Sequence, residues 1–369
     1  MLYMENLQPW MVLLSAPKLG SVQLLRLLEK FTDVGKIVTA GREELIRAGL
    51  ATPTIEHILR QNHPGLKLQL SWLQQPDNHI VTIQDAAYPP LLKKIADPPA
   101  ALFISGSLSL LKKDQIAIVG SRNPTETGRK TARLFASQLA DLDLVITSGL
   151  ATGIDSCAHH GAIEADGKTI AVLGNGPDIV YPARNRNLYR AIREKGALLS
   201  EYLPGTPPLA AQFPQRNRII SGLCKGVLVV EAAIRSGSLI TARLANEYGR
   251  EVFALPGSVY NPLSRGCHHL IKQGAKLTET VIDVVEELDI DIAECESGSA
   301  NNADSYTYQG NVDHPGMQLL LDHMGYDPVT INSLIENTGL TAETVSSMLC
   351  LLEVAGKVSS QGGFYTRIN

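Results

Sequence analysis

The sequence predicts an open α/β fold in which helices cover both faces of a mainly parallel, doubly wound sheet. Two observations lead to this fold class. Between residues 80 and 288, short apolar runs alternate with segments of helical periodicity, which is the pattern of parallel strands joined by helical crossovers. Most of these runs are apolar at nearly every position, as strands buried on both faces are. The predicted strands are 115–120, 144–149, 169–174, 197–202, 226–232 and 251–257.

Residues 1–79 predict a small helical N-terminal domain and a connector to the sheet. Apolar residues recur at helical spacing in residues 19–31, 41–50 and 53–61, and Gly, Pro and Thr separate these segments. The turns loosely resemble those of helix-hairpin-helix or SAM-like modules, whose backbone amides can meet phosphate. A structural cap without a ligand is the favoured interpretation of this domain.

Residues 80–288 form the predicted central domain. Its predicted helices are 127–142, 154–165, 185–196 and 238–249. Residues 289–313 combine acids with Ser, Asn and Gly and have no apolar period, which is typical of a linker. Residues 314–369 contain three helical segments followed by a hairpin with a glycine turn. That order resembles a winged helix, so we expect a winged-helix-like C-terminal domain.

Charge is distributed unevenly along the 369 residues. The net charge of −4 includes an acidic stretch, residues 277–356, which has 15 acidic residues and no lysine or arginine. Residues 1–276 hold 31 of the 33 basic residues and carry a net charge of +9. Basic surfaces attract the phosphate backbone of nucleic acids, so this part of the chain is the candidate for binding a polyanion. Acidic segments that only improve solubility are the alternative explanation.

The composition also argues against membrane association, secretion and cysteine chemistry. The longest apolar runs are strand-sized and shorter than a membrane span needs, so no membrane association is expected. The N-terminus carries Glu5 and lacks the basic start and cleavage site of a secretory signal, which predicts a cytoplasmic protein. Five cysteines without a CxxC pair fit reduced thiols.

The loops after the strands are the predicted binding site, because ligands of open α/β sheets lie beyond the carboxyl ends of the strands. Glycines there let a phosphate approach the backbone, and hydroxyl groups and helix N-termini donate hydrogen bonds to it. Tight strand-to-helix turns need glycine as well, so a single loop of this kind decides nothing. The candidate residues in these loops are Gly120, Ser121, Arg122, Ser148, Gly149, Thr152, Gly153, Ser236 and Ser238.

Arginines in two further loops favour a ligand with several phosphates. The candidates in YPARNRN and FPQRNRIISG are Arg184, Arg186, Arg216, Asn217 and Arg218. The guanidinium fork binds phosphate through two hydrogen bonds and also stacks on bases. If the RNR of residues 216–218 is extended just before a helix, both guanidiniums point one way and Asn217 faces elsewhere. Phe213 adds an aromatic ring on which a base can stack, although burial is the default role of a single Phe.

Other ligand classes lack their sequence signatures. GSRNPT replaces the GxGxxG of dinucleotide-binding enzymes, and the GxxxxGK of P-loop NTPases does not occur. The histidine pairs 159–160 and 268–269 are adjacent rather than at metal-ligand spacing, so no metal is expected.

One enzyme alternative stays open, a nucleotide N-glycosidase or phosphoribohydrolase in which Glu231 acts as acid or base. Pairing of Glu231 with Arg235, or capping of the next helix, is the favoured role of this carboxylate. The stretch RSGSLITAR also lacks the glutamate of the PGGxGTxxE motif that those enzymes carry. Both points argue against catalysis.

The motifs GSR, SGLATGID, YPARNRNL, FPQRNRIISGL, SGSLITA and ALPG occur in this order, and with them the chain resembles the DprA/Smf family of DNA-processing proteins. The resemblance implies a Rossmann-like domain that binds and protects single-stranded DNA, dimerises, and helps to load the RecA recombinase during natural transformation. It implies no cofactor, metal or catalysis. By resemblance, the DNA contacts are Arg122, the 149–153 loop, the YPARNR arginines, Phe213, Arg216 and Arg218.

The winged-helix-like segment departs from a DNA-binding module. Residues 315–369 hold five acids against Lys357 and Arg367, and the expected recognition helix at 341–356 has no basic residue. Such a surface cannot gain the phosphate attraction that dominates nucleic-acid affinity. We therefore predict a protein-contact or accessory role for this domain.

Overall fold

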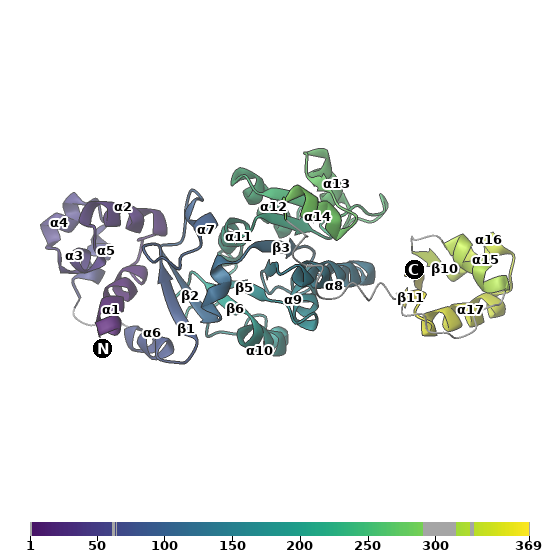
Figure 1. Ribbon diagram of the computed structural model, residues 1–369, viewed down its shortest axis with the longest axis horizontal. Helices are drawn as coiled ribbons and strands as arrows, with labels where there is room; N and C mark the ends of the chain where they lie inside the picture. The colour runs from purple at the N-terminus through teal and green to yellow at the C-terminus, as the bar shows by residue number, and fades with distance from the viewer. Residues whose placement is uncertain (1, 61–62, 64, 291–314, 325–327, 369) are drawn as a thin grey trace. The chain divides into compact units, whose positions relative to one another are not determined.

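The computed structural model of the protein describes residues 2–60, 63, 65–290, 315–324 and 328–368 (Figure 1). The chain forms two compact units, Met1–Ile292 and Ala293–Asn369. The predicted linker, residues 289–313, lies outside the described residues from residue 291 onward. The boundaries of the predicted domains stay predictions. Among the residues that the structure describes, no helix is long and apolar enough to cross a membrane.

A group of short helices, here called the helical module, opens the first unit. Its helices are α1 (Leu2–Leu14), α2 (Ser21–Phe31), α3 (Val34–Thr39), α4 (Arg42–Arg47), α5 (Thr52–Ile58) and α6 (Leu66–Leu73). Leu24, Ile37 and Trp72 of this module share a core with Ile80 and Phe103 of the sheet. The module is therefore packed against one edge of the sheet. The predicted helices correspond to α2, α4 and α5, whereas α1, α3 and α6 have no counterpart in the prediction.

The sheet of the first unit has the strand order β1-β2-β6-β5-β4-β3-β7-β8-β9. Its strands are β1 (Asn78–Thr82), β2 (Ala101–Gly106), β3 (Gln115–Val119), β4 (Val145–Ser148), β5 (Thr169–Leu173), β6 (Ala197–Ser200), β7 (Gly226–Val229), β8 (Glu251–Ala254) and β9 (Lys276–Leu277). In this order, every pair of neighbouring strands in the run β6-β5-β4-β3-β7-β8-β9 is parallel. Strand β2 pairs antiparallel with both β1 and β6. The predicted mainly parallel sheet is confirmed, and its predicted strands are β3 to β8.

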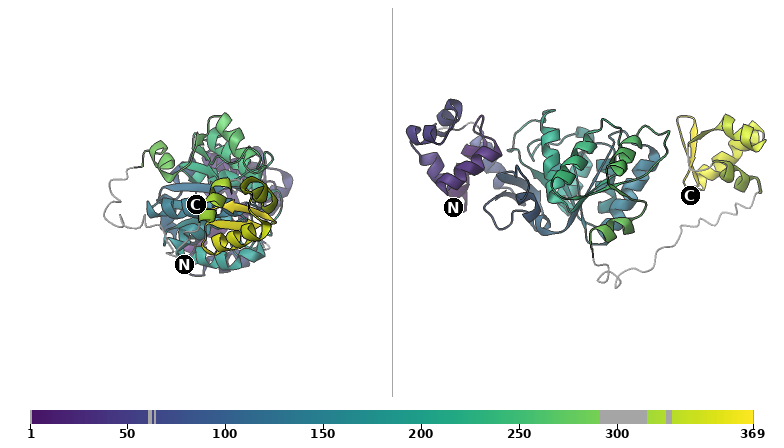
Figure 2. Two further views of the ribbon diagram at one scale, coloured as in Figure 1. Left: turned by 90° about the vertical axis from the view of Figure 1, so that its right-hand side faces the viewer. Right: turned by 90° about the horizontal axis from the view of Figure 1, so that it is seen from above.

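Alternation of side chains along the strands divides the core between two layers of helices (Figure 2). The helices around the sheet are α7 (Pro90–Lys93), η1 (Leu108–Lys112), α8 (Glu126–Asp141), α9 (Ile154–Glu164), η2 (Ala183–Asn185), α10 (Arg186–Lys195), α11 (Gln212–Leu223), α12 (Gly237–Glu247), α13 (Arg265–Lys272) and α14 (Val281–Glu287). On β3, Ile116 and Ile118 pack in the layer of α8 and α9, whereas Ala117 and Val119 pack in the layer of α11 and α12. This two-sided burial explains why the strands are apolar at nearly every position.

The second unit is a winged helix, as predicted. Its elements are α15 (Pro315–Met324), β10 (Val329–Thr330), α16 (Ile331–Thr338), α17 (Ala342–Val354), β11 (Val358–Gln361) and β12 (Phe364–Arg367). The strands form a small sheet in the order β10-β12-β11. Thr330 and Thr341 cap α16 and α17 with their side-chain oxygens. Leu320, Leu334 and Leu349 lie in the core that the three helices share.

Candidate nucleic-acid interface

A cleft with a volume of ≈ 700 Å³ opens at the carboxyl ends of the central strands. The β3–α8 loop, the β4–α9 loop, α11 and the start of α12 line it, as expected for an open α/β sheet. The predicted site residues that line it are Gly120, Ser121, Arg122, Phe213, Arg216, Asn217, Ser236 and Ser238. The predicted site residues outside its walls are Ser148, Gly149, Thr152, Gly153, Arg184, Arg186 and Arg218.

The β3–α8 loop, residues 120–125, presents Arg122 at the cleft and is here called the rim loop. Gly120 has no room for a side chain, because a Cβ would lie 2.9 Å from the carbonyl oxygen of Glu231. The Ser121 amide donates to the same carbonyl at 2.6 Å. The rim loop is thus tied to the end of β7, while the Arg122 side chain stays exposed.

The predicted residues of the β4–α9 loop lie next to the rim loop or to the strand that precedes it. Ser148 is buried, and its hydroxyl donates to the Ile118 carbonyl at 2.6 Å. Gly153 has a φ of 85°, and a Cβ there would overlap the backbone of the rim loop. The Thr152 hydroxyl donates to the Arg122 carbonyl at 3.4 Å. Thr152 and Gly153 therefore contact the loop that carries Arg122, whereas Ser148 is bonded to β3, and none of the three lines the cleft.

Arg216 and Asp155 lie at the floor of the cleft. Arg216 is 4% exposed, and its Nη1 donates to the carbonyl oxygens of Gly149, at 2.7 Å, and Val172. The Asp155 carboxylate accepts from the amides of Gly149 at 3.2 Å and Ala151 at 3.4 Å. Burial raises the pKa of Asp155 against the opposing effect of Arg216, and burial lowers the pKa of Arg216 to about 10. Arg216 is therefore a buried cation that holds the cleft together.

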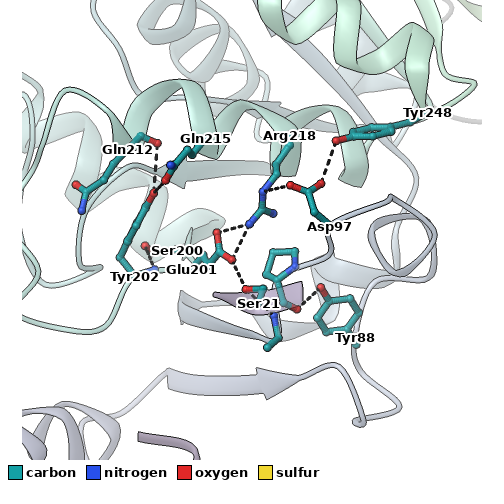
Figure 3. Close-up of polar contacts among 12 residues, drawn as sticks. Ser21, Tyr88, Asp97, Ser200, Glu201, Tyr202, Gln212, Gln215, Arg218 and Tyr248 are labelled. Carbon is teal, nitrogen blue, oxygen red and sulfur yellow. Dashed lines mark hydrogen bonds and ion pairs between the residues drawn. The ribbon is translucent and has the colours of Figure 1, made fainter. Parts of the chain in front are cut away.

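The expected extended conformation of residues 216–218 is wrong. These residues lie within α11, and helical residues two positions apart do not share a face. Arg216 and Asn217 line the cleft, but Arg218 does not. The Arg218 guanidinium instead forms ion pairs with Glu201 and Asp97 (Figure 3).

Glu231, the candidate acid or base, is engaged beneath the rim loop. Its carboxylate accepts from the amide of Thr125 at 2.9 Å and from the hydroxyl of Thr125 at 2.5 Å, at the N-terminus of α8. The expected pairing with Arg235 or capping of the next helix is therefore wrong. That next helix, α12, is capped by Ser236, whose hydroxyl oxygen accepts from the Ser238 amide at 3.3 Å. Glu231 anchors a different helix and is not part of the cleft wall.

An aromatic pair stands in the cleft wall. The ring centroids of Tyr181 and Phe213 are 5.3 Å apart, and the rings are tilted by 36°. Phe213 is half-buried against Gly174, whereas Tyr181 is 46% exposed. Sequence reasoning proposed Phe213 and missed Tyr181. The same signal, an aromatic residue beside arginines in YPARNRN, could have found it.

Exposed arginines lie both in the cleft wall and outside it. Arg184 and Arg186 are exposed at the start of α10 but outside the wall. Arg235 is exposed and lines the cleft beside the N-terminus of α12, although sequence reasoning chose only the serines of that loop. Within the described residues, neither Arg122 nor Arg235 makes an ion pair. Both cations are therefore available to an anionic ligand.

Two of the four histidines considered as metal ligands, His159 and His268, have hydrogen-bond partners within the protein. His159 is buried and its Nδ1 bonds to the Thr169 hydroxyl at 2.6 Å, while His268 bonds to the backbone of Gly257. Over the described part of the chain, no three His, Cys, Asp or Glu side chains come together as a metal site.

Comparison with known proteins covers both units of the chain. The family model for DNA recombination-mediator protein A matches residues 79–289, more than half of the chain, and the model of the DprA winged helix domain matches residues 313–363. The chain belongs to the DprA/Smf family. The resemblance found in the sequence motifs is therefore confirmed.

Relatives in the DprA/Smf family are similar over long stretches. Protein Smf of Escherichia coli (strain K12) is 40% identical over 99% of this chain and 96% of that protein. The DNA processing protein DprA of Streptococcus pneumoniae (strain ATCC BAA-255 / R6) is 50% identical over 56% of this chain and 73% of that protein.

Solved structures of DprA proteins share the fold. The X-ray structure of DprA from Streptococcus pneumoniae has 41% sequence identity and a TM-score of 0.67, covering 76% of this chain and 97% of that one. The DprA structure from Helicobacter pylori, described as giving insight into a single-stranded DNA binding mode, has 30% identity and a TM-score of 0.53, covering 58% of this chain and 98% of that one.

Proposed function

We propose that this DprA/Smf chain binds single-stranded DNA in the cleft and catalyses no reaction on it. The observation that carries the proposal is the combination, in one cleft, of the exposed cations Arg122 and Arg235 with the aromatic pair Tyr181–Phe213. Arginines attract phosphates whatever the sequence, and every base has a π-face that can stack on an aromatic ring. The described DNA-binding mode of the Helicobacter pylori relative supports the same class of ligand.

The positions of two carboxylates argue against the N-glycosidase alternative. The oxygens of Glu231 accept from Thr125 and lie outside the cleft wall. Asp155, the one carboxylate among the described residues of the wall, is 7% exposed and accepts from two backbone amides. Neither carboxylate is placed as a general acid beside a bound ribose.

A titration across a salt series tests the proposal. Labelled single-stranded oligonucleotide is expected to bind more tightly than duplex in anisotropy, with affinity falling as salt rises. Arg122→Ala and Arg235→Ala are each expected to reduce the salt slope by about 0.7, the value for one lost contact to a single strand. Arg243→Ala is the matched control, because Arg243 is exposed on the same helix as Ser238 but outside the cleft wall.

The same experiment includes the enzymatic alternative. A nucleoside monophosphate is incubated with the protein, and release of free base is followed by chromatography. Binding of the monophosphate with release of base, and no binding of single-stranded DNA, would establish the N-glycosidase and refute the proposal.

We propose further that the bound strand is protected in the cytoplasm and transferred to the RecA recombinase during natural transformation or recombination. Family membership supports this role. RecA-dependent ATP hydrolysis, on DNA covered by a single-strand-binding protein, is then expected to start sooner when this protein is added. No change in the lag would contradict the recombinase role while leaving DNA binding intact.

A homodimer through the Rossmann-like domain is the proposed active form. The sheet ends at β9, a two-residue edge strand, and Leu277 and Ile282 near this edge expose their apolar side chains. An exposed apolar sheet edge favours pairing with a second copy. Light scattering is expected to give the dimer mass for the native chain and the monomer mass for Leu277→Asp.

The winged-helix unit is proposed to contact protein rather than DNA. Helix α17 has no basic residue, and its side chains Leu351 and Val354 are exposed. A surface with exposed apolar side chains and a negative charge fits a protein partner better than the phosphate backbone of DNA. Removal of residues 315–369 is expected to leave the affinity for single-stranded DNA unchanged.

A further inference from the structure

A cluster of polar side chains surrounds Arg218 of α11, the predicted DNA contact that does not face the cleft (Figure 3). Arg218 Nη2 donates to both carboxylate oxygens of Glu201 at 2.6 Å, and its Nε lies 3.1 Å from an oxygen of Asp97. The side chains of Arg218 and Glu201 are 12% and 16% exposed, and that of Asp97 is 45% exposed. Burial alone would lower the pKa of Arg218, but Glu201 and Asp97 raise it above its ordinary value. This guanidinium is an internal cation whose charge is already balanced.

Glu201 links the cluster to the helical module. It directly follows β6, and it accepts a hydrogen bond from the Ser21 hydroxyl at 2.8 Å. Ser21 is the first residue of α2, and its hydroxyl oxygen also accepts from the Ala100 amide, just before β2, at 3.4 Å. One carboxylate therefore joins the helical module, the sheet and α11.

Asp97 links the cluster to α12. Its carboxylate accepts from the Tyr248 hydroxyl at 3.4 Å, and Tyr248 is the C-cap of α12. The N-terminus of α12 lines the cleft at Ser236 and Ser238, and α11 lines it at Asn217. Two of the helices that border the cleft, α11 and α12, are thus bonded to one group of side chains. This group, the Arg218 cluster, consists of Ser21, Asp97, Glu201, Arg218 and Tyr248.

We propose that Arg218 is a positioning residue, and that the Arg218 cluster couples the helical module to binding of the DNA strand. The inference rests on the proposed single-stranded DNA function. A largely buried charge that loses one of its partners is destabilised. Asp97 still pairs with Arg218 when Glu201 is altered, but the weakened bonding of Arg218 to Glu201 is expected to shift α11. Asn217, the preceding residue, then loses its place in the cleft wall. The helical module thereby influences affinity without touching the strand.

The Glu201→Gln variant distinguishes a positioning role of Arg218 from a simple effect of charge, because the two explanations predict opposite changes in the affinity for DNA. Removal of a negative charge near the cleft would tighten binding of a polyanion. Loss of the charged partner Glu201, which leaves Asp97 to pair with Arg218, is expected to displace α11 and weaken binding. We expect Glu201→Gln to weaken binding by about 3- to 30-fold, the range of coupling through packed networks, with the salt slope of the native protein.

Two further variants strengthen the test. Ser21→Ala changes no charge and lies in the helical module, and it is expected to weaken binding in the same direction as Glu201→Gln. Glu247→Gln is the matched control. It removes an exposed carboxylate beside Tyr248 whose ion-pair partner among the described residues is Arg243, and affinity is expected to stay within about 2-fold of the native value.

Thermal unfolding followed by circular dichroism establishes whether each variant folds. If the Glu201→Gln variant does not fold, the Arg218→Lys variant tests the positioning role instead. Lysine keeps the charge but loses the fork that bonds Glu201, so positioning predicts weaker binding with an unchanged salt slope.

The inference is overturned if Glu201→Gln binds as tightly as the native protein or more tightly. It is also overturned if Arg218→Gln lowers the salt slope by about 0.7, since that result identifies a phosphate contact. Arg122→Ala in the same series reports on the proposed function itself. If Arg122→Ala weakens binding and Glu201→Gln does not, only the coupling fails.

Discussion

His159 gives the first unit a predictable loss of stability in acid. The imidazole is fully buried in α9, and the Thr169 hydroxyl already donates its proton to the Ile146 carbonyl at 2.6 Å. His159 Nδ1 must therefore donate to Thr169, which leaves Nε2 unprotonated. Nε2 has no hydrogen-bond partner among the described residues. Protonation there would place an unsolvated cation in the core, and burial lowers the pKa of His159 to about 3.

The sign and size of the effect follow from linkage. The unfolded chain binds a proton at His159 with a pKa of about 6.5, whereas the folded chain does so only near 3. A folded pKa below the unfolded one means that stability is complete above pH 6.5 and is lost as the pH falls. At pH 5, the unfolded state gains about 2 kcal/mol from this one proton relative to neutral pH. For a unit that spans Met1–Ile292, the loss corresponds to a fall in Tm of about 3 °C.

Differential scanning calorimetry of the native protein and His159→Asn from pH 7 to pH 5 measures this loss. Asparagine can still donate to Thr169 but does not titrate, so the variant is expected to lose about 2 kcal/mol less over that interval. Other titrating groups are present in both proteins and cancel in the difference. His160→Asn is the control, because the neighbouring imidazole is not fully buried and its removal preserves most of the loss. Equal pH dependence of the native protein and His159→Asn would refute the reasoning.

Three further predictions concern the cleft and its rim. Gly153→Ala is expected to cost about 1–3 kcal/mol of stability in urea denaturation, because of its positive φ and the overlap of a Cβ with the rim loop, and to weaken DNA binding by displacing Arg122. Glu231→Gln is expected to lower stability by about 1.5–3 kcal/mol in thermal denaturation, since it weakens the charged bonds to Thr125; unchanged stability would contradict the anchoring role. Phe213→Ala is expected to weaken single-stranded DNA binding by about 5- to 150-fold at an unchanged salt slope, and a changed slope in anisotropy would count against stacking.

The central sheet could be predicted because two-sided burial leaves a strong signal in the sequence. Strands such as 115–119 and 226–229 are uninterrupted runs of buried residues. The antiparallel strands β1 and β2 were missed. Strand β1 pairs with β2, and β2 pairs with β6, while Ile80 of β1 and Phe103 of β2 are buried in a core shared with the helical module. The hydrophobic periodicity of a short segment gives no information about such a contact between distant segments.

The loops of the site could be predicted, but the directions of their side chains could not. Helix α11 begins at Gln212, with Pro214 in its first turn, where proline is tolerated. The sequence interpretation began this helix after Arg218 and so gave Arg216 and Arg218 a common direction. The sequence around Arg218 also cannot reveal its ion pair with Asp97, because Asp97 is more than a hundred residues away in the chain. Where a charged side chain finds its partner is a property of the tertiary structure.

The bonds on the rim loop bear on the entropy of binding. Ser121 and Thr125 are bonded to Glu231, and Gly153 packs against the loop from the other side. Fixing the backbone of one residue costs about 1–2 kcal/mol, and in this loop that ordering takes place during folding. A strand that enters the cleft therefore meets a preorganised surface, and the entropic penalty of association falls mainly on the DNA. That penalty should grow with the number of nucleotides immobilised, so the unfavourable entropy of binding should scale with oligonucleotide length rather than with any ordering of the protein.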